Sequence, residues 1–322
     1  MIIRVEIIEG IPGGATMKSI IRTTLCAVLL CIGAGSANAL ETVKVADNVY
    51  ALVGPTTQRS AENFGNNATF GVIVTGDGVI LVDPGGCARG AAEIDAAVKA
   101  ITGQPVKIVI NTGGQDHRWF GNGYFKARGA EIVAANAAVE DQQNRSNAQW
   151  QMMTMLTGDA TMAGTDLVYA DRRFDKTVTL TLGGVRVDVT LPAQAHTPGD
   201  AFVWLPEQRI VFAGDIVFMD RMLGVLPSSN SKSWLEAFAA IEKLNPAIVV
   251  PGHGNPGPLA RAQAETRDYL RHLRKEIGAL IEAGGSMIDA KKIDQSAFSS
   301  LAVFDQISRR NAQAVFAEME FE

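Results

Sequence analysis

The stretch VKIVINTGGQDHRWFGN, residues 106–122, decides the fold. Its first five residues are mostly β-branched and predict a short buried strand. The strand ends at the NTGG run, residues 111–114, where glycine permits a sharp turn. Asp116 and His117 follow directly, and a helical pattern continues over 119–128. A strand, a Gly-rich loop with polar side chains and a helix are typical of an α/β fold whose loops carry the site.

Two further histidines stand in the same context. His196 lies in AHTPGD, residues 195–200, and His253 lies in PGHG, residues 251–254. Asp215 ends another strand, in the run FAGD. Loops that follow strands can meet at one edge of a β-sandwich. Neutral imidazoles with carboxylates suit Zn²⁺, and they suit iron or manganese less exclusively. The sequence therefore predicts a metal site.

Strands and helices alternate along the chain in two successions. This order predicts two β-halves covered by helices on the outside, in one domain over 40–257 with a helical extension over 258–322 packed on it. Strands are expected over 43–53, 68–75, 79–83, 106–110, 131–134, 176–182, 185–191, 201–205, 209–213 and 247–250. Helices are expected over 88–102, 119–128, 135–156, 231–244 and 258–283, with a weaker helical pattern to residue 322.

Composition excludes several classes of protein. Of the 322 residues 47% are hydrophobic and 20% charged, so the chain can bury a sizeable core. The net charge is −5 and there is no Lys/Arg-rich run, so nucleic-acid binding through phosphates is not expected. Three cysteines without a CxxC motif exclude a disulfide framework.

The first 39 residues predict a secretory signal peptide. An apolar run over 24–33 follows Lys18 and Arg22, and the small-x-small pattern of residues 37–39 follows the run. Met17 heads the signal, so the natural start is expected there. The apolar run is shorter than the ~20 residues of a spanning helix, which favours a cleaved signal. A membrane anchor is the alternative interpretation of the same run. We expect a periplasmic or secreted protein with no membrane contact after cleavage.

These segments together resemble the metallo-β-lactamase superfamily, in particular its glyoxalase II-like hydrolases. The resemblance covers about residues 43–257 and implies an αββα sandwich. It rests on five elements in family order. The run VILVDPG at 79–85 looks like the family's strand ending in Asp-x-Gly, and residues 116–122 look like the end of its His-x-His-x-Asp-His motif. Residues 196–199 look like its middle His loop. Residues 214–215 look like its bridging carboxylate, and residues 251–253 look like its last His.

The chain departs from the family motif at its first two histidines. Counted back from Asp116-His117, these fall at Thr112 and Gly114. Anchoring the motif on residues 111–112 instead makes the loop one residue shorter. Both histidines are missing in either case.

The resemblance implies one metal rather than two. The first metal site keeps only His196 and a share of Asp215. The second site is complete, with Asp116, His117 and His253 as its ligands and Asp215 closing the set. We therefore predict a single ion, Zn²⁺, at these four residues.

The implied activity is hydrolysis of a small-molecule ester, thioester or lactam by attack of a metal-bound water on the acyl carbon. Asp116 and Asp215 are expected to take part, with Asp215 either a ligand or a base. His196 is expected to bind the water or the developing oxyanion. The alternative is a catalytically weak or inactive metal- or ligand-binding protein on the same fold. A metal-dependent oxidoreductase is a third possibility, and the sequence sets no oligomeric state.

Other residues near the motif have structural interpretations. Asp83 is expected to order its loop through backbone N–H groups rather than to bind metal. Gln115 and Arg118 either contact an anionic substrate, fill the space of a lost imidazole or lie on the loop surface. Trp119 and Phe120 are expected in the core. Core or helix-face packing is also favoured over a lid for Met152, Met153, Met155 and Met162.

Overall fold

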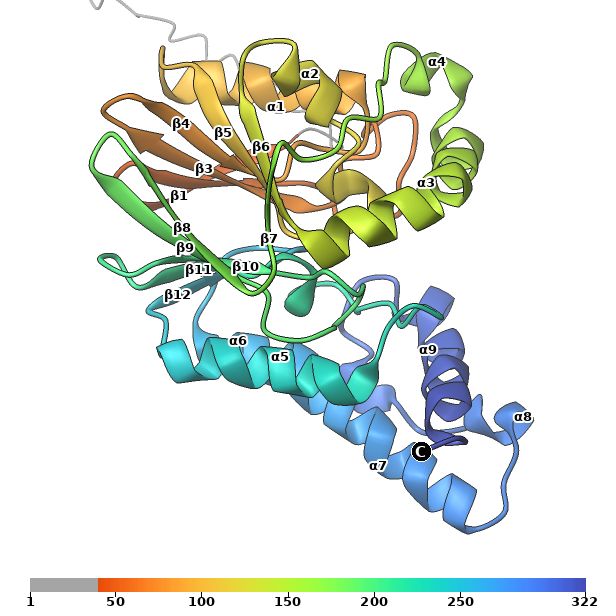
Figure 1. Ribbon diagram of the computed structural model, residues 1–322. Coiled ribbons are helices and arrows are strands. Elements are labelled where there is room, and N and C mark those ends of the chain that lie inside the picture. The colour runs from red at the N-terminus through yellow and green to blue at the C-terminus, as the bar shows by residue number, and fades with distance from the viewer. Residues whose placement is uncertain (1–39) are drawn as a thin grey trace, which may run out of the picture. The chain divides into compact units, whose positions relative to one another are not determined.

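The computed structural model of the chain describes residues 40–322, and the predicted signal peptide at 1–39 lies outside them. Within the described residues two sheets lie face to face, with helices on the outer face of each (Figure 1). This confirms the predicted αββα layers. Among residues 40–322, no helix has both the length and the apolar character that crossing a membrane requires.

The first sheet contains seven strands of the described chain in sequence order. Neighbours from β1 to β4 pair antiparallel, and those from β4 to β7 pair parallel. The strands are β1 (Glu41–Ala46), β2 (Val49–Val53), β3 (Thr69–Thr75), β4 (Gly78–Val82), β5 (Val106–Asn111), β6 (Glu131–Ala135) and β7 (Arg172–Phe174).

The second sheet contains five strands of the described chain in the order β12-β11-β10-β9-β8. Its pairs are antiparallel except for β11 with β12, which are parallel. The strands are β8 (Thr177–Leu182), β9 (Val185–Thr190), β10 (Phe202–Leu205), β11 (Ile210–Phe212) and β12 (Ile248–Val250).

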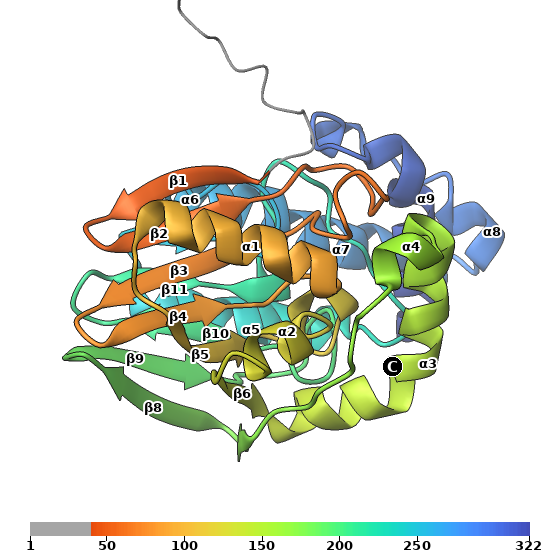
Figure 2. The same ribbon diagram turned by 90° about the horizontal axis from the view of Figure 1, so that it is seen from above.

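Helices cover the outer faces of both sheets. Figure 2 shows α1 lying across the strands of the first sheet. The helices before β7 are α1 (Ala88–Ile101), α2 (Asn122–Lys126), α3 (Asn136–Thr157) and α4 (Asp159–Met162). The later helices are α5 (Ser231–Leu244), α6 (Leu259–Ala262), α7 (Asp268–Glu282), α8 (Met287–Ala290) and α9 (Phe304–Met319).

Strand β4 shows how the layers hold together. Ile80 and Val82 pack into the core between the two sheets, while Val79 and Leu81 pack on the other face toward α1. Successive side chains of a strand point to opposite faces. A continuous run of apolar residues is therefore what a strand buried on both sides requires.

Helix α5 spans the predicted residues. The Asn230 side chain caps its start by accepting a hydrogen bond from the Ser233 N–H, and Asn245 ends it in the left-handed conformation, with φ of 46°. Its Trp234 Nε1 donates to the Ile216 carbonyl at 2.9 Å. This bond ties the outer helix to the loop that carries Asp215.

Two predicted elements before residue 130 are wrong in detail. The run 43–53 forms a hairpin of two strands, because Asn48 adopts a φ of 61° and turns the chain. The expected helix over 119–128 is reduced to α2, because Trp119, with φ of −150°, interrupts it. The residues before that interruption, Asp116–Arg118, form a single 3₁₀ turn.

The C-terminal helices share one hydrophobic cluster with the second sheet. Val211 and Val249 of that sheet pack in the same cluster as Leu270 of α7 and Phe316 of α9. The helix predicted over 258–283 is divided into α6 and α7 by a π-helical turn at Gln263–Arg267. The packing places α9 beside the loops that follow the strands of this sheet.

Candidate metal centre

The loops that carry the predicted residues meet at one edge of the sandwich. His117 follows β5, Asp215 follows β11 and His253 follows β12. The backbone joins the two sheets at this edge: the Ala201 N–H donates to the Thr112 carbonyl at 2.7 Å, and the Thr69 N–H donates to the Gly252 carbonyl at 2.8 Å. The strands therefore hold side chains that are far apart in the sequence within reach of one another.

Three of the predicted residues form a buried group. Among the residues that the structure describes, one ligand atom from each of His117, Asp215 and His253 lies within 4.8 Å of the others. The Nε2 atom of His117 is 3.3 Å from Asp215 Oδ2. The Nε2 atom of His253 is 3.3 Å from Asp215 Oδ1. Each imidazole thus faces a different oxygen of one carboxylate, and we call these three residues the triad.

Backbone carbonyls fix the tautomers of two imidazoles. His253 Nδ1 lies 2.7 Å from the Asn67 carbonyl oxygen, and His196 Nδ1 lies 2.9 Å from that of Gly224. A carbonyl only accepts, so each Nδ1 carries the proton and each Nε2 offers a lone pair. Burial lowers the pKa of His196 to about 4 and holds that of His253 well below its usual value. Both rings are therefore neutral near pH 7.

The triad fits a divalent cation. The lone pair of His253 Nε2 faces a carboxylate oxygen, which is unfavourable unless positive charge lies between them. His117 Nε2 is buried and has no hydrogen-bond partner within residues 40–322. A buried polar atom of this kind is expected to have a partner. Two imidazole nitrogens and a carboxylate oxygen are a donor set that zinc accepts, so a cation would satisfy both groups.

Arg118 holds the triad carboxylate in place. This fully buried side chain donates from Nε and Nη2 to Asp215, at 3.1 and 2.6 Å, and from Nη1 to Asp83 at 2.9 Å. Its Nη2 also donates to the Gly252 carbonyl at 2.9 Å. A Cβ at position 252 would lie 2.6 Å from that nitrogen, so glycine permits the approach. Burial alone would raise the pKa of Asp215, but the charge of Arg118 and the contacts with the His117 and His253 rings hold it well below its usual range.

Asp83 has the structural role predicted for it. Its Oδ1 accepts from the Thr112 N–H and its Oδ2 from the Thr112 hydroxyl, both at 2.7 Å. These bonds fix the backbone where β5 ends and the motif begins. A surface position for Arg118, one of the alternatives raised from the sequence, is wrong, because that side chain links Asp83 to Asp215 in the interior.

Asp116 lies on the other side of the His117 ring from Asp215. Its Oδ1 accepts from Arg59 Nε at 2.8 Å and from the His117 N–H at 2.7 Å. His117 Nδ1 lies 3.0 Å from this oxygen and 2.7 Å from Arg59 Nη2. Burial would raise the pKa of Asp116, but the charge of Arg59 and the hydrogen bonds with His117 hold it well below its usual range. Asp116 is not part of the triad group, and its contacts orient the ring that is.

His196 is also separate from the triad group but opens onto the same cavity. That cavity measures about 80 Å³ and is bordered by His117, His196 and His253 together. The His196 ring packs against Trp234 and Phe218, with centroid distances of 5.6 and 5.8 Å. The structure thus turns all three predicted imidazoles toward one small space.

The carboxyl group of Asp200 fills the space beside Gly113, where one of the missing imidazoles could lie. A Cβ on Gly113 would lie 2.5 Å from Asp200 Oδ1. Asp200 is buried and accepts from the Thr197 N–H at 2.7 Å and the Thr197 hydroxyl at 2.5 Å. Gln115 contributes its side chain to the cavity lining instead. No imidazole fits at 113 without moving this carboxylate.

These contacts favour one register of the altered motif. This register differs from the two suggested by the sequence: anchored on residues 111–112 with no residue removed, the motif places its missing histidines at Gly113 and Gln115, its Asp at His117 and its last His at Arg118. In that register the triad residue and the arginine that supports it both occupy motif positions. Asp116 falls on an unspecified position, in agreement with its place outside the triad group.

The aromatic and methionine residues near the motif are structural where they are buried. Trp119, Phe120, Met153 and Met162 belong to one small hydrophobic cluster under α3 and α4. Met152 and Met155 are exposed. Met152 borders a cleft of about 300 Å³ that shares Gln115 and Leu226 with the metal cavity.

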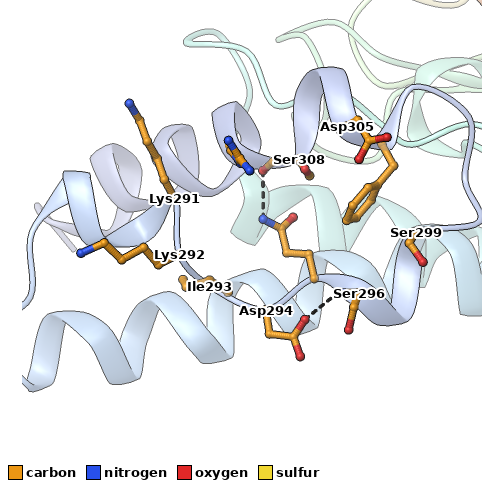
Figure 3. Close-up of a pocket in the computed structure, with 11 residues that line it drawn as sticks. Lys291, Lys292, Ile293, Asp294, Ser296, Ser299, Asp305 and Ser308 are labelled. Atoms are coloured by element: carbon orange, nitrogen blue, oxygen red, sulfur yellow. Dashed lines mark hydrogen bonds between the residues drawn. The ribbon is translucent and has the colours of Figure 1, made fainter.

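The sequence did not indicate several contributors to the site. Arg59 supports Asp116, and Arg221, Ile307 and Arg310 line the cavity. Of these residues only Arg59 could have been expected from the sequence, since a buried carboxylate such as Asp116 needs a cation nearby. A larger cavity of about 730 Å³ lies elsewhere, between the segment after α8 and the first turns of α9, and no histidine lines it (Figure 3). The candidate metal centre therefore lies at the small cavity, not the large one.

Comparison with known proteins agrees with this geometry. A family model of the metallo-beta-lactamase superfamily matches residues 64–253, more than half of the chain. The chain therefore belongs to the metallo-β-lactamase superfamily, a family of hydrolases. A curated relative, the metallo-beta-lactamase type 2 of Elizabethkingia meningoseptica, is 26% identical over 239 residues, which cover 70% of this chain and 86% of that protein.

Solved structures share the fold. A metallo-beta-lactamase from Pontibacter korlensis matches with a TM-score of 0.59 and 23% identity, over 72% of this chain and 99% of that one. The stereoselective inverting sec-alkylsulfatase Pisa1 from Pseudomonas sp. matches with a TM-score of 0.67 and 16% identity, over 86% of this chain and 50% of that one. At these identities the likeness concerns the fold alone.

Proposed function

We propose that this protein is a hydrolase that holds one divalent cation, Zn²⁺, with His117, Asp215 and His253. The observation that carries the proposal is the unpartnered Nε2 of His117, which with the lone pair of His253 Nε2 faces the Asp215 carboxylate. Iron or manganese would fit the same atoms less exclusively. Membership in the superfamily supports the hydrolase class.

The chain's own residues prepare the site for such chemistry. Arg118 keeps Asp215 ionised and fixes its two oxygens, and the Asn67 carbonyl fixes the His253 tautomer. Asp116 and Arg59 hold the His117 ring. A bound cation would supply Lewis acidity, which makes water a better nucleophile and stabilises negative charge on oxygen.

His196 is placed to act on the reacting water. Its Nε2 lone pair borders the cavity, because its Nδ1 is engaged with the Gly224 carbonyl. A neutral imidazole can accept a hydrogen bond from water and take up its proton as the new bond to carbon forms. We propose that Asp116 orients His117 through their hydrogen bonds, in place of the direct metal ligation expected from the sequence.

The Gly113–Asp200 contact supports a single metal. The carboxyl group of Asp200 lies beside the Gly113 backbone, and Gln115 stands where the other motif histidine would be. Of the histidines of the first metal site, only His196 remains. One neutral imidazole and a share of Asp215 make a weak site. We propose that this position serves substrate and water rather than a second ion.

The substrate we propose is a small molecule with an ester, thioester or lactam bond. The cavity of about 80 Å³ is small beside the ~300–1,000 Å³ of typical ligand pockets, so only the reacting group enters it. The remainder can lie in the neighbouring cleft that Met152 borders. We also propose that the protein works in the periplasm or outside the cell, on the strength of the predicted signal peptide.

Metal analysis combined with acyl hydrolysis tests the proposal. Protein purified without chelator is expected to carry about one zinc per chain and to hydrolyse ester or thioester substrates, with turnover lost in Asp116→Ala and His253→Ala. His272→Ala is the control, because His272 lies on α7 and bonds the Asp294 carbonyl. Stoichiometric metal without turnover on any acyl substrate would instead establish a binding protein on this fold.

A further inference from the structure

Among residues 40–322, three arginines line the cavity of the candidate metal centre, and two of them form no ion pair with a described carboxylate. Arg59 pairs with Asp116 at 2.7 Å. Arg221 and Arg310 form no ion pair with any residue in the described range 40–322. Both nevertheless border the cavity that contains the three imidazoles.

Arg221 is the more unusual of the two because it is buried. It is 6% exposed, and its neutral partners are the Thr56 carbonyl, at 3.0 Å from Nε, and Gln58 Oε1, at 3.5 Å from Nη2. Burial, with the charges of Arg59 and Arg310, lowers its pKa to about 10. A buried charge without a counter-charge is costly, so the site lacks an anion on this side.

Arg310 comes from α9, where its side chain is exposed and borders the cavity. Its neighbour Asn311 is fully buried, donates to the Leu223 carbonyl at 2.7 Å and accepts from the Val225 N–H at 2.9 Å. These bonds fix α9 to the loop that contains Gly224, whose carbonyl orients His196. The C-terminal extension therefore supplies a charged wall of the site.

The carboxylates nearby do not neutralise this wall. Arg59 already compensates Asp116, and Arg118 is shared by Asp83 and Asp215. A divalent cation at the triad would add further positive charge to the same small space. Guanidinium groups bind oxyanions through paired N–H donors, which a lone ammonium cannot do.

We propose that Arg221 and Arg310 bind an oxyanion group of the substrate, so that the preferred substrates are anionic rather than neutral. The group is a carboxylate, a sulfate or a phosphate, which all present charged oxygens to the guanidinium donors. This inference rests on the proposed function in one respect, namely that the cavity is where the substrate reacts. It assigns to α9 the role of a specificity element.

Anion binding tests the proposal without any turnover. Inorganic sulfate, inorganic phosphate and acetate are titrated into the full-length purified protein by calorimetry at constant ionic strength, with zinc and after zinc removal. We expect the preferred anion to bind in both states, with Kd raised at least tenfold in Arg310→Gln. Arg309→Gln is the matched control: Arg309 is the next residue of α9 and borders the cavity of Figure 3 instead. Its Kd is expected within twofold of the parent value.

Either of two results would overturn the proposal. One is equal weakening in the Arg310 and Arg309 variants, which would mean that only the overall charge of α9 matters. The other is the absence of anion binding once zinc is removed, which would mean that the metal alone attracts the anion. The order of affinity among the three probes separates a carboxylate site from a site for a tetrahedral anion.

Kinetics separates this inference from the proposed function. The esters p-nitrophenyl butyrate and p-nitrophenyl hydrogen succinate share a leaving group and a chain length, and a terminal methyl in one is a carboxylate in the other. We expect kcat/KM to favour the anionic ester at least tenfold and the preference to vanish in Arg310→Gln but not in Arg309→Gln. Equal rates on both esters contradict the inference. Arg310-dependent sulfate binding without hydrolysis of any ester, thioester or lactam would sustain anion binding and overturn the proposed function.

Discussion

The two sides of the candidate metal cavity differ in how many potential metal ligands they hold. On one side His117, Asp215 and His253 are buried together, and each has a partner behind it: Asp116, Arg118 and the Asn67 carbonyl. On the other side His196 stands without the two imidazoles that the family motif would supply. Asp200 takes the space beside Gly113, and Gln115 faces the cavity.

This contrast teaches where metal affinity comes from. On the triad side, neighbouring groups fix the ligand atoms, the tautomer of His253 and the charge of the carboxylate. Groups that orient ligands in this way are a substantial part of a metal site. The opposite side keeps one lone pair and is lined by arginines from elsewhere in the fold. One half of the cavity therefore offers the ligand atoms of the proposed cation, and the other half offers the guanidinium groups of the proposed anion site.

Removal of one triad ligand should have the largest effect. His253→Ala is expected to reduce bound zinc from about one per chain to near zero, because only His117 and Asp215 would remain. Elemental analysis after dialysis measures this, with His272→Ala unchanged. Full zinc occupancy in His253→Ala would show that His253 is not a ligand and that the triad side is not the metal site.

The support behind the triad should matter next. Arg118→Met is expected to lower the free energy of unfolding by ~3–5 kcal/mol, since it leaves Asp83 and Asp215 buried without a cation. Urea denaturation of the metal-free protein measures the loss. Arg186→Met, which breaks an exposed pair with Asp188, is the control and should cost about 0–1 kcal/mol. Similar losses in both variants would contradict the role given to Arg118.

Restoring a histidine on the side of His196 tests whether a second metal can bind there. Gly113→His is expected to destabilise the fold by about 1–3 kcal/mol and to add no second zinc, because Asp200 fills that space. Gly103→His is the control, since a Cβ there meets nothing within 4 Å. A second equivalent of tightly bound zinc in Gly113→His would show that this side is not blocked.

Asp200 should also give this side a pH signature. Burial and the nearby charge of Asp215 raise the pKa of Asp200 to about 8, so the folded protein keeps a proton that the unfolded chain releases near its ordinary value of 3.8. The stability from this proton is complete at low pH and is lost as pH rises to about 8, by up to about 1.4 kcal/mol per pH unit.

Asp200→Asn removes this titration and serves as the comparison. Thermal or urea unfolding of the two proteins at pH 5, 7 and 9 measures the difference between them. We expect the parent protein to lose stability relative to the variant from pH 5 to 7, and much less beyond pH 8. Parallel curves across this range would show that Asp200 is ionised in the folded protein.

Local patterns predicted much of the fold because they are written in neighbouring residues. Helix α5 matches its predicted range because its caps and apolar face lie within one segment. The β1–β2 hairpin was missed, since Asn48 reverses the chain inside a run that alternates like one strand. Strand-end loops indicated His117, Asp215 and His253 because residues after strands gather at a sheet edge.

The partners of those residues could not be predicted in the same way. Arg118 meets Asp83 and Asp215 through pairings set by the packing of two sheets, and Arg310 reaches the cavity only because α9 folds back on the second sheet. The sequence also suggested two registers for the altered motif, both ending at Asp116 and His117. The position of Arg118 on the triad carboxylate favours a third register without a gap, which no local pattern indicated.

X-ray absorption spectroscopy of the zinc-loaded protein, together with its metal content, tests the central claim most directly. We expect about one zinc per chain, bound by two imidazole nitrogens and at least one carboxylate oxygen, with one imidazole lost from the spectrum in His117→Ala and no ligand lost in Asp116→Asn. Two zinc ions per chain, or a zinc shell that loses an oxygen in Asp116→Asn and no imidazole in His117→Ala, would contradict it.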